Sequence, residues 1–268
     1  MAIITISRQM GSGGIPIVQQ IAEELGYTLV DGDIIKEVAS DYDLTDEAIH
    51  QIDEKPPVFV ENLDRQIELN MNRIQLIVLE QALEGNVIIY GRGGQDLLPN
   101  ITSVLRVRVI APFEERVERW AEREWIDPDL ARSLVRKSDQ QRAGFIKYYF
   151  DRDWDNPVEY DLVINTTRIS NETAVKLIKE ATQDPYLIEK THICKSKIND
   201  LIIQKKIQIA RLDDDRIEDI WFNIDVVDRH VTLSGHVYSE AERQAALDDA
   251  RQVEGVSGVT DKLKIVNY

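Results

Sequence analysis

The feature that most constrains this chain is a glycine-rich segment that separates an apolar stretch from an amphipathic one. Gly11-Ser12-Gly13-Gly14 follows the apolar residues 3–7, and Pro16 opens a segment with apolar residues at helical spacing. This order predicts a buried strand, a tight turn and a helix, because glycine tolerates positive φ and proline suits a first helical turn. Free N–H groups at such a helix start bind anions, phosphate above all. We therefore expect Gly11, Ser12, Gly13 and Gly14 to form a phosphate-binding loop.

This loop lacks two chemical groups of the standard phosphate loop, G-x-x-x-x-G-K-[ST]. The lysine of that pattern reaches the β- and γ-phosphates, and its hydroxyl residue binds magnesium. Gly14 and Ile15 stand at the two positions here. The pattern therefore predicts the geometry of a nucleotide site without its usual cation. Either other basic residues supply the positive charge, or the site binds a nucleotide without turning it over.

The composition disfavours several partners and locations. The formal net charge of −16 argues against a nucleic-acid backbone or an anionic membrane as the main partner. No apolar run approaches the ~20 residues that span a bilayer, and Arg8 interrupts the first apolar run, so we expect no membrane span and no signal peptide. The single cysteine, Cys194, cannot form an internal disulfide and is expected to be a buried thiol. We expect a cytoplasmic protein.

The pattern of apolar runs predicts an α/β fold for the first two thirds of the chain. Short buried strands alternate with amphipathic helices, which is typical of a parallel sheet with helices on both faces. The strands are expected at residues 3–7, 27–30, 87–90, 104–111 and 160–165, and the longest helices at 63–82 and 129–150.

The pattern changes near Asp184-Pro185, where we expect a second, smaller α+β domain to follow. Its elements are a helix at 193–210, strands at 221–227 and 231–235, a helix capped by Ser239, and a last strand at 262–266. The predicted domains are residues 1–185 and 193–268.

Three motifs in the first domain carry a resemblance to a known family. They are Thr5-Ile6-Ser7-Arg8-Gln9 with the glycine loop, Gly91-Arg92-Gly93, and Asp153-Trp154-Asp155-Asn156-Pro157 leading to Tyr160-Asp161-Leu162-Val163-Ile164-Asn165-Thr166. In this order they resemble the cytidylate kinase-like family, relatives of the nucleoside monophosphate kinases, over roughly residues 1–182. The resemblance implies a P-loop kinase fold, ATP as phosphate donor with Mg²⁺, and a small-molecule nucleotide as the acceptor.

The resemblance also implies roles for residues outside the loop. It implies catalytic roles for Arg8, Arg132, Asp139 and Arg142, a donor-binding role for Arg116, and acceptor-binding roles for Asp31 and Arg92. Plainer interpretations stay open, because Arg8 could be a surface arginine, Asp31 a turn residue, and the arginines after 112 members of helix-surface ion pairs. Gly93 replaces the aspartate that follows this arginine in cytidylate kinases, which leaves cytosine recognition undecided.

The second domain resembles a BON domain. The matching segments are Val231-Thr232-Leu233-Ser234-Gly235-His236-Val237 and Val253-Glu254-Gly255-Val256-Ser257-Gly258-Val259. Their glycine turns and valine-rich strands indicate architecture and do not identify a ligand. We interpret this domain as an interaction or regulatory module that binds a protein or a small ligand, and an oligomer is also possible.

Three functions follow from these observations as hypotheses. The first is an enzyme that transfers phosphate from ATP to a nucleoside monophosphate or a similar small acceptor. The second is a nucleotide-binding sensor without turnover that signals through the BON-like domain. The third is a structural or assembly protein that associates through that domain.

Overall fold

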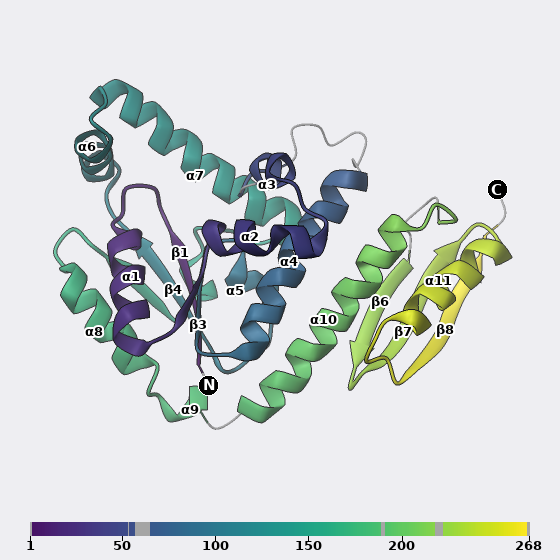
Figure 1. Ribbon diagram of the computed structural model, residues 1–268. Helices are drawn as coiled ribbons and strands as arrows, with labels where there is room; N and C mark the ends of the chain where they lie inside the picture. The colour runs from purple at the N-terminus through teal and green to yellow at the C-terminus, as the bar shows by residue number, and fades with distance from the viewer. Residues whose placement is uncertain (1, 53, 57–64, 189–190, 218–221, 267–268) are drawn as a thin grey trace.

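The first sheet places its strands in the order β2-β3-β1-β4-β5, all parallel (Figure 1). The strands are β1 (Ile3–Arg8), β2 (Thr28–Val30), β3 (Val87–Tyr90), β4 (Val104–Ile110) and β5 (Leu162–Asn165). In the computed structural model, residues 2–52, 54–56, 65–188, 191–217 and 222–266 are described. Ile4 of β1 lies opposite Ile88 and Leu105 of its two neighbours, so β1 is the buried centre of the sheet.

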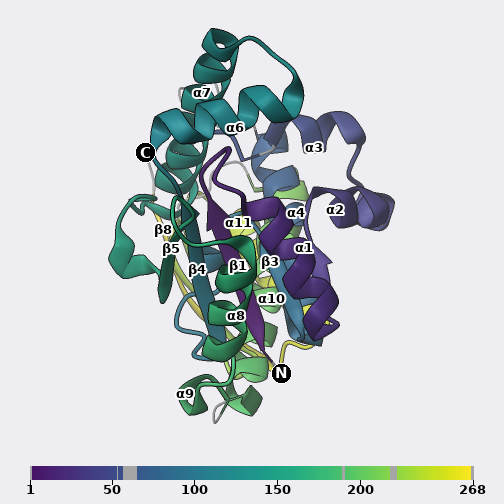
Figure 2. The same cartoon turned by 90° about the vertical axis from the view of Figure 1, so that its left-hand side faces the viewer.

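Helices cover both faces of this sheet because its central strands are apolar on both sides. Ile4 and Ile6 pack toward α1 (Gly14–Leu25) and α8 (Asn171–Ala181), which lie in front of the sheet in Figure 2. Ile3 packs on the opposite face with α4 (Arg65–Glu84). A near-continuous apolar run is what a parallel strand buried on both faces requires. The predicted α/β class with helices on both faces is confirmed.

Short helices and a long hairpin lie around the first sheet (Figure 1). The short elements are α2 (Gly32–Val38), η1 (Ala39–Tyr42), α3 (Asp46–Ile52), α5 (Gly94–Leu97), η2 (Pro157–Glu159) and α9 (Pro185–Ile188). The hairpin consists of α6 (Phe113–Glu124) and α7 (Pro128–Phe150), with Asp127 as the N-cap of α7. It has a small apolar core of its own, made by Val117, Ala121, Ala131 and Val135.

The second sheet contains β6 (Phe222–Val227), β7 (His230–Val237) and β8 (Gly258–Ile265). β6 and β7 are antiparallel, whereas β7 and β8 are parallel and are joined through α11 (Glu240–Gln252). The Ser239 hydroxyl accepts a hydrogen bond from the Glu242 N–H at 3.0 Å, which confirms the predicted cap. β8 begins four residues before the predicted strand. Trp221, predicted in β6, and Leu63, predicted in α4, lie outside the described residues.

One helix, α10 (Thr191–Asp213), belongs to both hydrophobic cores. Cys194, Ile198 and Ile202 pack into the core that contains α4, and Ile203 and Ile207 pack under the second sheet. In Figure 1, α10 lies between α4 and β6. α10 therefore buries apolar side chains on two of its sides. The buried Cys194 thiol fits this position, as predicted. The division into residues 1–185 and 193–268 stays a prediction.

Arg65 ties the start of α4 to the end of α10. Its guanidinium donates hydrogen bonds to the carbonyl oxygens of Leu212 at 2.5 Å, Ile217 at 2.9 Å and Asp214 at 2.7 Å. The last carbonyl groups of a helix have no partner within the helix, and a cationic donor satisfies them with favourable charge. The two domains are therefore joined by a buried helix and by a specific polar cap. None of the helices in the described ranges has the length and apolar composition that crossing a bilayer requires.

We expect Arg65→Met to lower the free energy of unfolding by about 3 kcal/mol, because several charge-assisted hydrogen bonds are lost together. Urea unfolding followed by circular dichroism measures this change. Arg73→Met is the matched control, because Arg73 lies on the same helix but bonds to Asp43 away from α10. Equal destabilisation by the two substitutions would contradict a special role for Arg65 at this junction.

Candidate functional site

The glycine loop leaves the carboxyl end of β1 and enters α1. Gly11 has φ +77°, and a Cβ atom there would lie 2.5 Å from the carbonyl oxygen of Arg116, so only glycine fits. Gly13 is the N-cap of α1 and provides no side-chain acceptor to the first N–H groups of that helix. The Ser12 hydroxyl is buried and donates to the Gln9 carbonyl at 2.7 Å. The loop therefore offers backbone N–H groups to an anion, while its hydroxyl stabilises the turn.

Arg116 and Asp139 brace this loop from the hairpin side. Arg116 Nη1 donates to Asp139 Oδ2 at 2.7 Å and to the Met10 carbonyl at 3.0 Å. Asp139 Oδ1 accepts from the Met10 N–H at 3.3 Å. On the other side, the Thr166 hydroxyl donates to the Ser12 carbonyl at 2.8 Å. Arg116 is buried behind the loop, so the structure places it against the loop backbone and not in a cavity.

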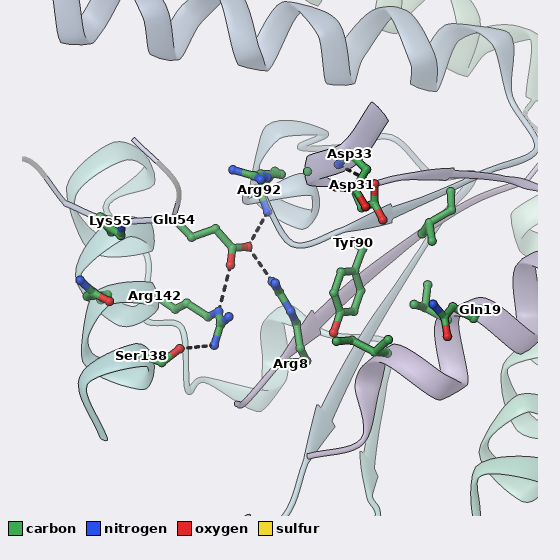
Figure 3. A pocket seen from close by; sticks show the side chains of 15 residues that line it. Arg8, Gln19, Asp31, Asp33, Glu54, Lys55, Tyr90, Arg92, Ser138 and Arg142 are labelled. Atoms are coloured by element: carbon green, nitrogen blue, oxygen red, sulfur yellow. Dashed lines mark hydrogen bonds and ion pairs between the residues drawn. The ribbon is translucent and has the colours of Figure 1, made fainter. Parts of the chain in front are cut away.

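Glu54 is the centre of a charged cluster at the carboxyl ends of β1 and β3. Its carboxylate accepts from Arg8 Nη1 at 2.6 Å, from Arg142 Nε at 2.9 Å and from the backbone N–H of Arg92 at 2.8 Å (Figure 3). The guanidinium of Arg8 also lies over the Tyr90 ring, 4.1 Å from its centroid. Three elements far apart in the sequence meet at this carboxylate.

The charges of this cluster control its protonation. Burial alone raises the pKa of the Glu54 carboxyl, but Arg8, Arg142 and Arg92 outweigh it and hold that pKa well below its usual range. Burial alone lowers the pKa of Arg8, and Glu54 raises it above the ordinary value. Both groups are therefore charged at neutral pH.

Gly91 makes this cluster possible. It has φ +77°, and a Cβ atom there would lie 1.9 Å from Glu54 Oε1 and 2.1 Å from Arg8 Nη1. The carboxylate and the guanidinium thus meet directly against the backbone that follows β3.

Two cavities adjoin the cluster. The loop cavity, of about 120 Å³, contacts the glycine loop. It is lined by Arg8, Gln9, Met10, Gly11, Ser12, Gly13, Gly14, Ile15, Pro16, Tyr90, Trp120, Arg123 and Arg142. The larger cavity, of about 400 Å³, is lined by Arg8, Ile15, Val18, Gln19, Leu29, Asp31, Gly32, Asp33, Glu54, Lys55, Tyr90, Arg92, Ser138, Gln141 and Arg142. Arg8 and Arg142 line both cavities and therefore stand where the two meet.

Asp31 and Arg92 both line the larger cavity, and their acceptor-binding roles stay predictions. Asp31 is also the N-cap of α2, because its carboxylate accepts from the N–H groups of Asp33 at 3.0 Å and Ile34 at 3.3 Å. Asp31 therefore stabilises the turn before α2 and lines the cavity at the same time. Arg92 has a positive φ of 59° between two glycines, which places its backbone N–H on Glu54.

Three predicted site residues line neither cavity: Arg116 and Asp139, which brace the loop, and Arg132, which lies on the surface of the hairpin. The Arg132 side chain is 38 % exposed on α7 and bonds to Glu114 at 2.6 Å and Asp129 at 2.8 Å. These are surface ion pairs within the hairpin, and the catalytic role of Arg132 stays a prediction. Arg142, three turns further along the same helix, reaches the cluster instead.

Sequence reasoning missed Glu54 and Tyr90. Glu54 is the last residue of a stretch that the sequence predicts as helical, two residues before Pro56. Tyr90 is the last residue of a buried strand and reads as core. Neither position carries a local signal, because both roles arise from long-range contacts with Arg8. Trp154 of the third motif is buried, and its indole N–H donates to the Ser7 hydroxyl at 2.9 Å, so it packs inside the fold.

The described residues do not form a metal centre. They contain no group of three His, Cys, Asp or Glu side chains that could hold a metal ion. Asp139, the carboxylate braced against the loop, accepts from Arg116 and from the Met10 N–H. Mg²⁺ in nucleotide sites usually binds phosphate oxygens, waters and one or two carboxylates. Asp139 is already engaged by these two donors and does not fit that role in this arrangement.

The sheet order and the glycine loop after the first strand define a P-loop, kinase-like α/β protein with an appended small domain. The chain belongs to the cytidylate kinase-like family, whose sequence pattern matches residues 3–168. The pattern of the BON domain matches residues 199–267.

Several known proteins are similar to the first domain. The cytidylate kinase of Methanopyrus kandleri is 31 % identical over 195 residues, which cover 69 % of this chain and 94 % of that protein. The cytidylate kinase of Halobacterium salinarum is 28 % identical over 189 residues, or 70 % of this chain and 92 % of that protein. An uncharacterized protein from Eubacterium ventriosum has a similar structure, with a TM-score of 0.55 and 22 % identity, covering 69 % of this chain and 99 % of that one. The last comparison supports the fold alone.

We expect the contribution of Glu54 to stability to depend on pH. Because its pKa is lowered on folding, the stabilisation is complete above the usual value of 4.5 and is lost as the pH falls below it. Glu54→Gln should lower the free energy of unfolding by about 3 kcal/mol at pH 7, the size expected for a broken buried ion pair. The difference between variant and wild type should shrink between pH 4.5 and pH 3.

Urea unfolding at several pH values measures this difference. Glu159→Gln is the control, because Glu159 forms a more exposed pair with Arg152 and should change stability by less than about 0.5 kcal/mol. A cost of Glu54→Gln that is the same at all pH values would contradict the assigned charge state.

Proposed function

We propose that this protein transfers a phosphoryl group from ATP to a nucleoside monophosphate. The observation that carries the proposal is that Arg8 and Arg142 line both the loop cavity and the larger cavity. Phosphoryl transfer needs donor and acceptor aligned, with cations at the transferring group between them. The two cavities supply that alignment, and the two arginines stand at their junction.

The loop cavity suits the donor phosphates. The glycine loop and the start of α1 line it, and the backbone N–H groups of such a loop bind phosphate without a side chain. Gly14 stands where the usual lysine would reach the β- and γ-phosphates, and Arg8 and Arg142 supply positive charge at the same place. ATP is the donor in this proposal, and Mg²⁺ would arrive bound to its phosphates and neutralise their charge.

The larger cavity suits the acceptor. Its volume of about 400 Å³ lies within the ordinary range of small-molecule sites. Arg92 provides a guanidinium for the acceptor phosphate, and Asp31 provides a carboxylate for hydroxyl or amino groups. A charged lining of this kind in a chain of net charge −16 points to a small phosphate ligand and not to a polyanion.

The names of the relatives support a nucleoside monophosphate acceptor, because the cytidylate kinases cover most of this domain. A separate question is which nucleobase the acceptor carries. Gly93 follows Arg92 here, and its position is closed by Phe150, whose ring would lie 2.4 Å from a Cβ atom. An aspartate cannot occupy that space in this packing. Recognition of the base therefore requires other groups of the larger cavity.

Arg142→Met should reduce kcat about 100-fold or more, because it removes one preorganised cation from the transferring phosphate. ADP formation from magnesium-ATP with a panel of CMP, UMP, AMP, GMP and their deoxy forms measures this. Arg152→Met is the matched control, because Arg152 pairs with Glu159 outside both cavities. No ADP formation above that of a Gly13→Asp variant with any acceptor would overturn the proposal.

A nucleotide sensor without turnover is the second candidate, favoured by the rigid attachment of α10 to α4. Arg65 and the buried residues of α10 fix the BON domain to the helix that follows the Glu54 segment. In this alternative the second domain reports on nucleotide binding through a partner of its own. Isothermal titration calorimetry should then show micromolar ATP binding in a protein that forms no ADP, whereas turnover would exclude it.

A further inference from the structure

We propose that Glu54 is a positioning residue for the phosphoryl-transfer reaction, holding the guanidinium groups of Arg8 and Arg142 toward the loop cavity. This inference rests on the proposed function. In this role the buried Glu54 carboxylate fixes the orientation of the two guanidinium groups.

Each of the two guanidinium groups uses only part of its hydrogen-bonding edge on Glu54. Arg8 gives Nη1 to the carboxylate and lays its face on the Tyr90 ring. Arg142 gives Nε to Glu54 and Nη1 to the Ser138 hydroxyl at 2.6 Å. A guanidinium has five N–H donors in one plane. The remaining donors of both groups are thus oriented by contacts already made.

The residues that line the two cavities show on which side of the cluster the carboxylate lies. Arg8 and Arg142 line the loop cavity, and Glu54 is absent from the described residues around it. Glu54 lies on the side of the larger cavity. The carboxylate therefore stands behind the two cations as seen from the glycine loop. A phosphate at the loop would therefore lie on the arginine side of the cluster and not on the carboxylate side.

Glu54 is built to stay in this place. Its side chain is only 10 % exposed, and the backbone N–H of Arg92 provides a third donor. Gly91 clears the space that its Oε1 atom occupies. Separating a buried carboxylate from its partners is expensive, because the charges left behind are desolvated and unpaired. A substrate phosphate should therefore add to the arginines without displacing Glu54.

The carboxylate also reduces the repulsion between the two arginines that replace the lysine of a standard phosphate loop. Two guanidinium groups that converge on one phosphate repel each other before the substrate arrives. A carboxylate between them removes that repulsion and leaves a net positive charge for the phosphate. Cations held in place beforehand need no reorganisation in the transition state, which is where their effect on rate arises.

The test compares wild type, Glu54→Gln and the control Glu159→Gln in the same steady-state assay. The variant keeps the size of the side chain but removes the charge that holds the arginines. We expect kcat to fall about 100-fold, with KM for ATP and for the acceptor changed by less than about tenfold. A lower KM for the acceptor with wild-type kcat would overturn the inference. Such a result would mean that Glu54 fills the place of a substrate phosphate in the free protein and is displaced when the substrate binds.

Two further measurements keep the inference testable if the variant folds poorly or the wild type shows no turnover. Glu54→Asp keeps the charge but is one methylene too short to reach both guanidinium groups, so its kcat should lie between those of wild type and Glu54→Gln. A wild-type kcat in Glu54→Asp would overturn the inference. Calorimetric titration with ATP reports on the arginines without turnover. We expect Glu54→Gln to bind ATP three- to tenfold more weakly, and tighter binding would contradict the positioning role. Absence of turnover in the wild type would refute the proposed function alone.

Discussion

The structure depends on one buried carboxylate that holds two guanidinium groups at the carboxyl edge of a parallel sheet. Glu54 joins Arg8 at the end of β1, Arg142 on α7 and the turn after β3. Ligands of open α/β sheets bind at this edge, where the loops leave the strands. Because the loop lacks a lysine, the site needs positive charge from elsewhere, and the Glu54 cluster concentrates it between the two cavities. The fold thus supplies, through Arg8 and Arg142, the positive charge that the glycine loop lacks.

The second constraint is the attachment of the BON domain. α10 gives Cys194, Ile198 and Ile202 to one core and Ile203 and Ile207 to the other, so the domains share a helix and not a linker. Arg65 caps the end of that helix from the first residue of α4. Helix α4 thus connects the second domain to the chain segment that begins with Glu54. Such a junction transmits a displacement more readily than a flexible tether would, because packed interfaces deform little.

Local sequence patterns predicted the fold well and the site only in part. The strand–loop–helix at the start, the cap at Ser239 and the alternation of strands and helices follow from glycine chemistry, capping and hydrophobic period, which are all local properties. Asp31, Arg92 and Arg142 reach the larger cavity because each follows a strand or lies on the inner side of α7. Arg132 does not, because Glu114 and Asp129 satisfy it on the surface. Glu54 and the sharing of α10 could not be predicted, since both depend on contacts between distant segments.

The most direct test of the central claim is a crystal structure of the wild-type chain with ADP and a nucleoside monophosphate bound together. The account predicts phosphate oxygens within hydrogen-bonding distance of guanidinium nitrogens of both Arg8 and Arg142, with the Glu54 carboxylate still bonded to both arginines. Phosphates bound by the glycine loop with the two arginines turned away, or with Glu54 expelled from between them, would contradict it.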